Sequence, residues 1–325
     1  MRDDRISPLL ILLMAVVAGG LAVSCFFLPG GSADASSGIV GTAWLSVLLA
    51  VACIGATVVS MGILNSDSFL FTSDGRLLYL PYLLVAFSVT GAIHFSFFHV
   101  AAILTVWSVF LAARYLNSEK VRMDSIFGAM LISGAASMAL PSVMYMQVMI
   151  FLYCLFRRRH DFMRYLLASV AGAAVPWLYI LVWGFVFPSR LSFVDFAGNY
   201  MDGIAVSLPE PASLTVHEHI WYSFLLLLAV RSAVFVLGRM RERNKAQKNA
   251  FGLSVALSVV SVLAAVFCGW PEDPLASIVF AVPVSLVVFD FFSGAGRARV
   301  TVWIVLLVLL AAAQRVLEFF PAMSI

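Results

Sequence analysis

Apolar segments about as long as a bilayer is thick follow one another along the whole chain, with short polar stretches between them. A helix that crosses the hydrocarbon core needs roughly 20 predominantly apolar residues. Such segments form helices, because lipid offers no partners for backbone polar groups. The sequence therefore predicts an all-α, polytopic transmembrane bundle of about eleven spans (10–12). The candidate spans are 8–28, 39–64, 77–93, 100–116, 126–140, 143–156, 165–187, 220–237, 251–268, 274–289 and 300–320.

The composition excludes a soluble or a disordered chain. Hydrophobic residues make up 62% and charged residues 11% of the 325 residues, against roughly 45–50% and about 25% in soluble domains. So few charges do not cover a soluble surface of this size, and disorder requires low hydrophobicity. We therefore expect one integral membrane domain over residues 1–325, with the lipid bilayer as its first partner and no nucleic-acid partner.

The basic residues predict how the chain is oriented. With the N-terminus inside, all but three of the 20 Lys and Arg residues fall on inner segments, as the positive-inside rule demands. We expect a bacterial inner-membrane protein with a cytoplasmic N-terminus and an external C-terminus. The inner residues are Arg2, Arg5, Arg76, Arg114, Lys120, Arg122, Arg157, Arg158, Arg159, Arg164, Arg239, Arg241, Arg243, Lys245, Lys248, Arg297 and Arg299.

Proline and small residues predict details of the bundle. Pro141 interrupts the apolar stretch 126–156, so we expect two short helices that turn at residues 140–142. Small residues cluster around Gly134 and Gly172, which favours close approach of helices.

The longest segment between spans, 188–219, alternates apolar and polar residues. This pattern predicts an amphipathic helix lying in the outer interface. It is either a platform over a membrane-embedded cavity, with Arg190, His217 and His219 as substrate-binding residues, or a solvated connector. His217 and His219 do not share a helix face, and the four cysteines have no ligand spacing, so no metal or other cofactor is predicted.

Charges within spans are costly, and they are often functional. Arg231 lies eleven residues into the segment 220–237, where we expect it to face the bundle interior and a polar partner. It is either an anion-binding group or half of a buried pair. Arg315 lies near the outer end of the last span, with Glu318 one turn further on. Both arginines are candidates for binding a phosphate.

Carboxylates on the outer side are the candidates for general-base catalysis. They are Asp34 in the first outer loop, and Glu272 with Asp273 in a tight turn before the tenth span. Asp273 equally suits a helix cap. The chain has no Walker A phosphate loop, no HExxH motif and no nucleophile elbow. Whether the protein is an enzyme is left open by the sequence.

The run from Asp124 to Phe187, with Pro141, the arginines at 157–159 and Pro176, resembles a bacterial domain-of-unknown-function family of polytopic inner-membrane proteins. The likeness extends over most of the chain, including Pro283 in the tenth span. That resemblance implies a topology and no reaction.

More distantly, the same succession of a small-residue span, a proline break and a basic inner loop is similar to the GT-C membrane glycosyltransferases. This resemblance implies a polyprenyl-phosphate-linked sugar as substrate. Those enzymes place catalytic acids in a long outer loop after the first span. Here that loop is short and holds only Asp34.

Three functions remain open. The first is assembly of an envelope glycan from a lipid-linked sugar by a GT-C-like bundle, with Asp34, Glu272 or Asp273 as base and Arg190 or Arg231 on the phosphate. The second is a non-catalytic scaffold that binds other membrane proteins of an envelope complex. The third is a transporter or lipid flippase with Arg231 in its pathway. Transporters usually show repeated broken helices, and Pro141 has no counterpart in the second half.

Overall fold

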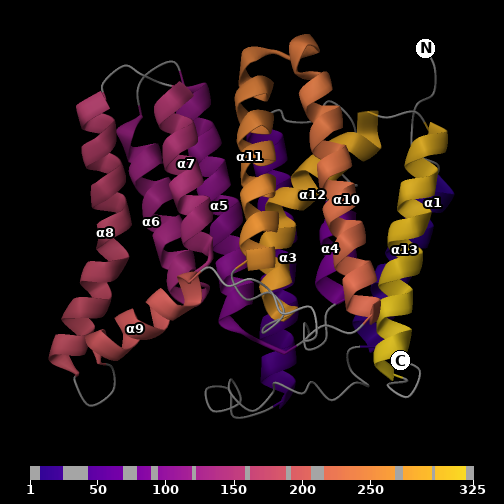
Figure 1. The fold of residues 1–325 in the computed structure, drawn as a ribbon, viewed down its shortest axis with the longest axis horizontal. Coiled ribbons are helices and arrows are strands. Elements are labelled where there is room, and N and C mark those ends of the chain that lie inside the picture. The colour runs from indigo at the N-terminus through magenta and orange to yellow at the C-terminus, as the bar shows by residue number, and fades with distance from the viewer. Residues whose placement is uncertain are drawn as a thin grey trace.

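The computed structural model describes residues 8–24, 43–68, 79–88, 94–118, 122–157, 162–187, 192–205, 216–267, 274–294 and 297–319, and these residues contain twelve α-helices and no strand (Figure 1). The predicted all-α class is therefore confirmed. The helices are α1 (Pro8–Ser24), α3 (Ala43–Ser68), α4 (Tyr79–Phe87), α5 (Phe97–Asn117), α6 (Met123–Ala139), α7 (Val143–Arg157), α8 (Phe162–Val186), α9 (Phe193–Ile204), α10 (Val216–Gly238), α11 (Lys245–Phe267), α12 (Ser277–Gly294) and α13 (Arg297–Phe319). Two single 3-10 turns, η3 (Met240–Glu242) and η4 (Pro274–Ala276), precede α11 and α12.

Each predicted apolar segment contains one helix, and α9 is the additional one. Within the described residues, seven helices are long and apolar enough to cross a membrane: α3, α5, α8, α10, α11, α12 and α13. The chain is thus a multi-pass membrane protein. Seven is fewer than the predicted eleven, because α1, α6 and α7 have 17, 17 and 15 residues and α4 has only nine.

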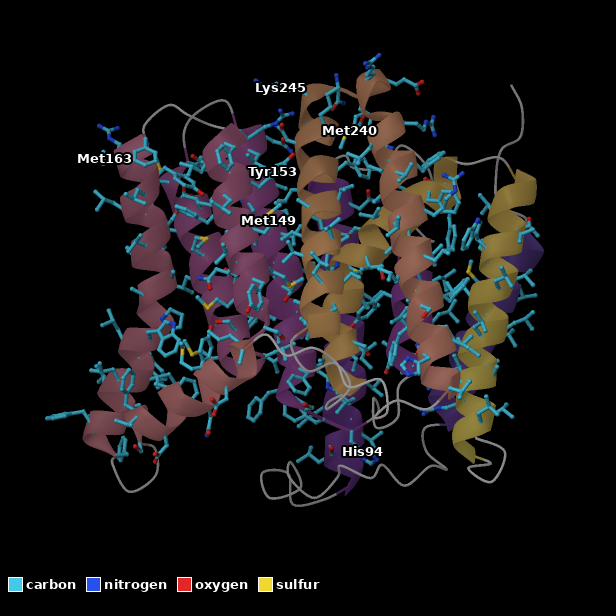
Figure 2. The ribbon with its side chains drawn as sticks, in the orientation of Figure 1. His94, Met149, Tyr153, Met163, Met240 and Lys245 are labelled. Carbon is cyan, nitrogen blue, oxygen red and sulfur yellow. The ribbon has the colours of Figure 1, made fainter. Side chains whose placement is uncertain are left out.

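Successive long helices run up and down the bundle (Figure 1). Met163 at the start of α8, Met240 after α10 and Lys245 at the start of α11 lie together at one end, and His94 lies at the other (Figure 2). We call the first of these the basic end. The described residues that define it are Arg114, Arg122, Arg157, Arg164, Arg239, Arg241, Arg243, Lys245 and Lys248.

Helix α12 forms the centre of the bundle and α8 forms one flank. In the most apolar stretch of α12, 83% of the residues are buried, against 17% in the corresponding stretch of α8. Helices α4, α5, α10 and α11 surround α12, whereas α8 packs mainly on α6. Pro283 lies inside α12, and the hydroxyl of Ser258 on α11 donates a hydrogen bond to the Pro283 carbonyl oxygen at 2.7 Å. This bond fastens α11 to the middle of the central helix.

The proline turn and the close helix approach are both confirmed. Helix α6 ends at Ala139 and α7 begins at Val143, and the Met144 amide donates to the Pro141 carbonyl at 2.9 Å across the turn. Helices α6 and α8 meet at Gly172, where a β-carbon would collide with the Phe127 carbonyl oxygen. Only a glycine therefore fits at this crossing.

Helix α9 lies across the end of the bundle opposite the basic end, beneath α6, α7 and α8 (Figure 1). The Ser192 side chain caps it by accepting a hydrogen bond from the Asp195 amide. Phe193, Phe196 and Tyr200 make one aromatic face, and Trp177 of α8 contacts all three rings. The predicted amphipathic helix is thus present.

Candidate functional site

A buried asparagine joins three helices at the basic end. Asn249 of α11 donates from Nδ2 to the Leu116 carbonyl oxygen of α5 at 3.3 Å, and accepts at Oδ1 from Arg157 Nε of α7 at 3.0 Å. Carbonyl groups in the last turn of a helix lack partners within the helix. Asn249 therefore satisfies the end of α5 and holds the end of α7 beside it.

An ion pair joins the turn after α10 to the central helix. Arg243 Nη2 donates to Asp290 Oδ2 of α12, and the two side chains are 11% and 9% exposed. The Arg243 guanidinium also lies 3.8 Å from the ring centroid of Phe251. Removing one member of such a pair strands a buried charge. Arg243 and Asp290 therefore fix the basic end of α12.

Arg239 adds a second attachment between α10 and α12. Its Nη1 donates to the Gly294 carbonyl oxygen at 3.0 Å, and its Cζ lies 5.5 Å from the centroid of Phe235. Its Nε is 3.5 Å from Glu242 Oε2. A β-carbon on Gly294 would meet this guanidinium, so a larger residue there would displace the Arg239 side chain. The Arg239 side chain is 44% exposed, which leaves it accessible to water and to lipid head groups.

Arg231 of α10 lies eight residues, or about two helical turns, before Arg239, which directly follows the helix. It is seven residues before Gly238, on the order of 10 Å from the basic end of α10. It is half-buried, and its Cζ lies 5.7 Å from the centroid of Phe291 of α12. Among the described residues no carboxylate pairs with it. Within the described part of the chain, Arg231 thus contacts an aromatic ring in place of the expected polar partner.

Arginines and phenylalanines alternate along this seam of α10 and α12. Arg231 lies over Phe291, Phe291 meets Phe235 edge to face with centroids 5.4 Å apart, and Arg239 lies over Phe235. When a guanidinium stacks on an aromatic ring, the flat face of the guanidinium makes the contact. The N–H donors point outward along the edge of the guanidinium and remain able to form hydrogen bonds. Edge donors of this kind bind phosphate or carboxylate oxygens in pairs. The seam is therefore suited to receive an anion.

The opposite end of the bundle is held by α9. The Tyr200 hydroxyl donates to Ser137 Oγ at 3.1 Å, and the Tyr145 hydroxyl donates to the Ile204 carbonyl oxygen at 2.6 Å. Burial raises the pKa of Tyr200, which keeps the phenol protonated as a donor. The Trp177 and Tyr200 rings are 4.6 Å apart between centroids. Aromatic rings therefore pack between α9 and α8. A platform over a cavity was one of the two alternatives that the sequence left open for this segment.

The outward face of α9 is polar. Asp195, Asn199 and Asp202 are exposed and follow one another at i, i+4 and i+7, so they share one face of the helix. These carboxylates face away from the aromatic contacts of α9.

The structure separates the predicted phosphate-binding residues that it describes. Arg231 lies toward the basic end of α10, whereas Arg315 lies four residues before the opposite end of α13 and is buried. His219 is exposed in the first turn of α10, far from Arg231 along the helix. The remaining predicted site residues lie outside the described residues or have side chains outside them: Asp34, Arg190, His217, Glu272 and Asp273, together with Glu318.

The groups that contact Arg231 and its seam were not predicted as site residues. Asp290 stands out in an apolar run, but its partner Arg243 is 47 positions away, and nothing in the sequence links the two. Phe291 and Phe235 look like ordinary apolar residues of spans. Their role depends on which faces of α10 and α12 meet.

No group of three or more His, Cys, Asp and Glu side chains is gathered for a metal ion in the described part of the chain. No protein-family model matches the chain, and no curated protein or solved structure matches it significantly.

Proposed function

We propose that the chain crosses the bacterial inner membrane eleven times, with the basic end and the N-terminus in the cytoplasm and the C-terminus outside. The clustering of Arg and Lys at one end of the bundle supports this orientation. At the other end, Tyr179, Trp183 and Phe187 form an exposed row of neighbouring rings at the end of α8 and just after it. Aromatic residues concentrate where a membrane meets water, so this row supports an interfacial position for α9.

We further propose that the protein binds a lipid-linked phosphate and acts in envelope glycan or lipid-linked-sugar assembly. The observation that carries this proposal is Arg231, a cation within a span that no described carboxylate neutralises. An unpaired charge at this depth is expensive, and such residues usually bind a ligand or line a pathway. A phosphate group supplies both the missing charge and the acceptors for the free edge of the guanidinium.

A transfer reaction in this proposal takes place at the outer face, as the resemblance to the GT-C glycosyltransferases implies. Its general base is Asp34, Glu272 or Asp273, since an acceptor hydroxyl needs a positioned carboxylate. The exposed Asp202 of α9 is a further candidate on that face. Arg231 lies in the half of α10 nearer the basic end, too far from the outer face to contact the leaving phosphate of this transfer. In this proposal it holds a lipid phosphate at a separate binding site.

The test replaces Arg231 and follows the bound lipid. Arg231→Leu, Arg231→Lys and the control Arg241→Leu, an exposed arginine of η3, are purified in mild detergent and analysed by native mass spectrometry. We expect wild type and Arg241→Leu to retain a phosphate-bearing lipid, Arg231→Lys to retain less, and Arg231→Leu to lose it at normal abundance. The envelope glycan profile of cells carrying Arg231→Leu should change in parallel.

Equal lipid retention in all four proteins contradicts the proposal. Loss of protein abundance in Arg231→Leu alone indicates that Arg231 is structural. The Arg231→Lys variant separates these outcomes, because it keeps the charge in the span and removes only the planar, two-pronged donor geometry.

A non-catalytic scaffold is the second candidate, and helix α8 favours it. Leu167, Leu178, Val182 and Phe185 are strongly exposed along a helix that contacts the bundle mainly through α6. Such a face packs on lipid or on a helix of another membrane protein. If glutamine substitutions along this face abolish co-purification of a partner while lipid retention stays normal, the scaffold function replaces the first proposal.

A further inference from the structure

Arg231 lies at the margin of a surface that faces lipid. Leu227 and Val234, at i−4 and i+3 from it, are 55% and 58% exposed. On α13, Val302 and Leu309 are 56% and 58% exposed. One side of Arg231 therefore rests on Phe291 of the buried helix α12, and the other side borders a surface that lipid chains cover.

Charges and aromatic rings follow a fixed order along this surface. Arg239 lies at the basic end of α10, Arg231 follows at about 10 Å from that end, and Phe224 lies roughly 10 Å further on. The Phe224 ring meets Trp303 of α13 with centroids 5.9 Å apart, and Trp303 also meets Phe291 at 6.3 Å. We call Arg239, Arg231, Phe224 and Trp303 the α10–α13 flank.

We propose that the α10–α13 flank binds a phosphate-headed lipid from the leaflet at the basic end, which is the cytoplasmic leaflet. The head group lies between Arg239 and Arg231, and the hydrocarbon chain follows Phe224 and Trp303 toward the middle of the membrane. This inference rests on the proposed function and adds the leaflet and the direction in which the lipid is held.

The order of the residues selects the leaflet. A lipid of the leaflet at the basic end has its phosphate nearest that end and its chain toward the midplane, which is the order of Arg239, Arg231 and Phe224. A lipid of the other leaflet needs an accessible cation near the opposite end. Among the described Arg and Lys residues only Arg315 lies near that end, and it is only 2% exposed.

The donors required for a phosphate are present. Arg239 uses Nη1 for the Gly294 carbonyl oxygen and Nε for Glu242 Oε2, and its side chain is 44% exposed, so Nη2 is its donor for a phosphate. Arg231 makes a face contact with Phe291, which leaves the N–H groups of its edge for phosphate oxygens. Two guanidinium groups two turns apart suit a head group that first meets the exposed Arg239 and then the deeper Arg231.

The test supplies a lipid to one leaflet only. The full chain is reconstituted into phosphatidylcholine vesicles, and vesicles with the basic end outward are separated from those with it inward by an affinity tag on the N-terminus. A long-chain isoprenyl phosphate that carries a photoreactive diazirine is added from outside, irradiated, and located by peptide mass spectrometry. We expect labelling of α10 and α13 peptides, at least tenfold stronger when the basic end faces outward.

Variants connect the labelling to the flank. Arg231→Gln and Arg239→Gln should each lower the labelling several-fold, Arg231→Lys should keep a part of it, and Arg241→Gln should leave it unchanged. Millimolar inorganic phosphate should not compete, because the site recognises a phosphate that carries a hydrocarbon chain. Melting temperatures measured on the same samples show whether each variant is folded.

The outcomes separate the two proposals. Equal labelling from both sides, or stronger labelling from the opposite side, overturns the leaflet assignment and leaves lipid-phosphate binding intact. Labelling that is unaffected by Arg231→Gln in a folded protein places the lipid elsewhere and overturns the inference. Absence of labelling in both orientations, with no phosphate-bearing lipid retained on purification, overturns the proposed function as well.

Discussion

Gly203 of α9 lies directly against the ring of Pro141 in the turn between α6 and α7. A β-carbon on Gly203 would be 2.8 Å from Pro141 Cγ and 3.0 Å from Pro141 Cβ. Nearby, the Tyr145 hydroxyl donates to the Ile204 carbonyl oxygen. Because a proline ring is rigid, it does not move aside for a larger residue. The missing side chain at position 203 thus sets how closely α9 approaches the bundle.

Gly203→Ala should loosen α9 from the proline turn. Overpacking of a close contact typically costs about 1–3 kcal/mol, so we expect a lower melting temperature in detergent, followed by tryptophan fluorescence. The matched control is Gly198→Ala in the same helix, where a β-carbon meets nothing within 4 Å. Alanine there should stabilise the helix by about 0.5–1 kcal/mol. Opposite signs for the two substitutions confirm the contact, and equal signs contradict it.

Gly172→Ala should separate α8 from α6. A β-carbon at position 172 collides with the Phe127 carbonyl oxygen and lies 3.1 Å from Met130 Cβ. Backbone atoms cannot shift without moving the whole helix, so we expect a loss of stability of about 1–3 kcal/mol. Gly55→Ala in α3, with open space around its β-carbon, is the control. A melting temperature for Gly172→Ala as high as that of the control argues against close packing of these helices.

Arg243 and Asp290 should behave as one unit. Breaking a buried ion pair by removing one partner costs about 3–5 kcal/mol, because a charge is left buried. We expect Arg243→Leu and Asp290→Leu each to destabilise the protein strongly, and the double variant to be less affected than the sum of the two. A double-mutant cycle of chemical unfolding measures this coupling. Simple additivity would show that the pair contributes no interaction energy.

Local patterns in the sequence predicted much of the fold. The length of the apolar runs predicts the helices, Pro141 predicts the turn, and the small residues around Gly172 predict the close approach of α6 and α8. Each of these depends on residues that are adjacent in sequence or on the size of a single side chain. Helix ends were less well predicted. Helix α4 is nine residues long, whereas the predicted span 77–93 has seventeen residues. Hydropathy does not mark the residue at which helical hydrogen bonding stops.

The candidate site was predicted only in part. The charge of Arg231 within an apolar run marked it as unusual, but its depth was counted from residue 220, whereas α10 begins at Val216 and continues to Gly238. Its neighbour Phe291 comes from a helix sixty positions later in the chain. Pairings between distant helices depend on rotation about each helix axis, which one sequence does not specify.

The eleven-span topology predicts opposite locations for two reporters. A reporter fused after Lys248, at the basic end, should be active only in the cytoplasm, and one fused after Ile325 only outside. The measurement uses alkaline phosphatase and green fluorescent protein as paired reporters at each position. Because an even number of crossings between the two positions would leave them on the same side, finding both reporters in one compartment contradicts the predicted topology.

The last prediction separates an enzyme from a scaffold and concerns the carboxylates of the outer face. A transfer to an acceptor hydroxyl requires one carboxylate close to the reacting oxygen, and Asp34, Asp202, Glu272 and Asp273 are the candidates. We expect alanine at one of the four to remove an envelope glycan product while membrane abundance stays normal. The control is Asp195→Ala, an exposed carboxylate in the first turn of α9, where only a small loss of helix stability is expected. Abundance is measured by immunoblotting of membranes, and products by mass spectrometry of extracted glycans. If all four variants keep the wild-type glycan profile, the chain does not catalyse the transfer, and a binding function for Arg231 or for the α8 face takes its place.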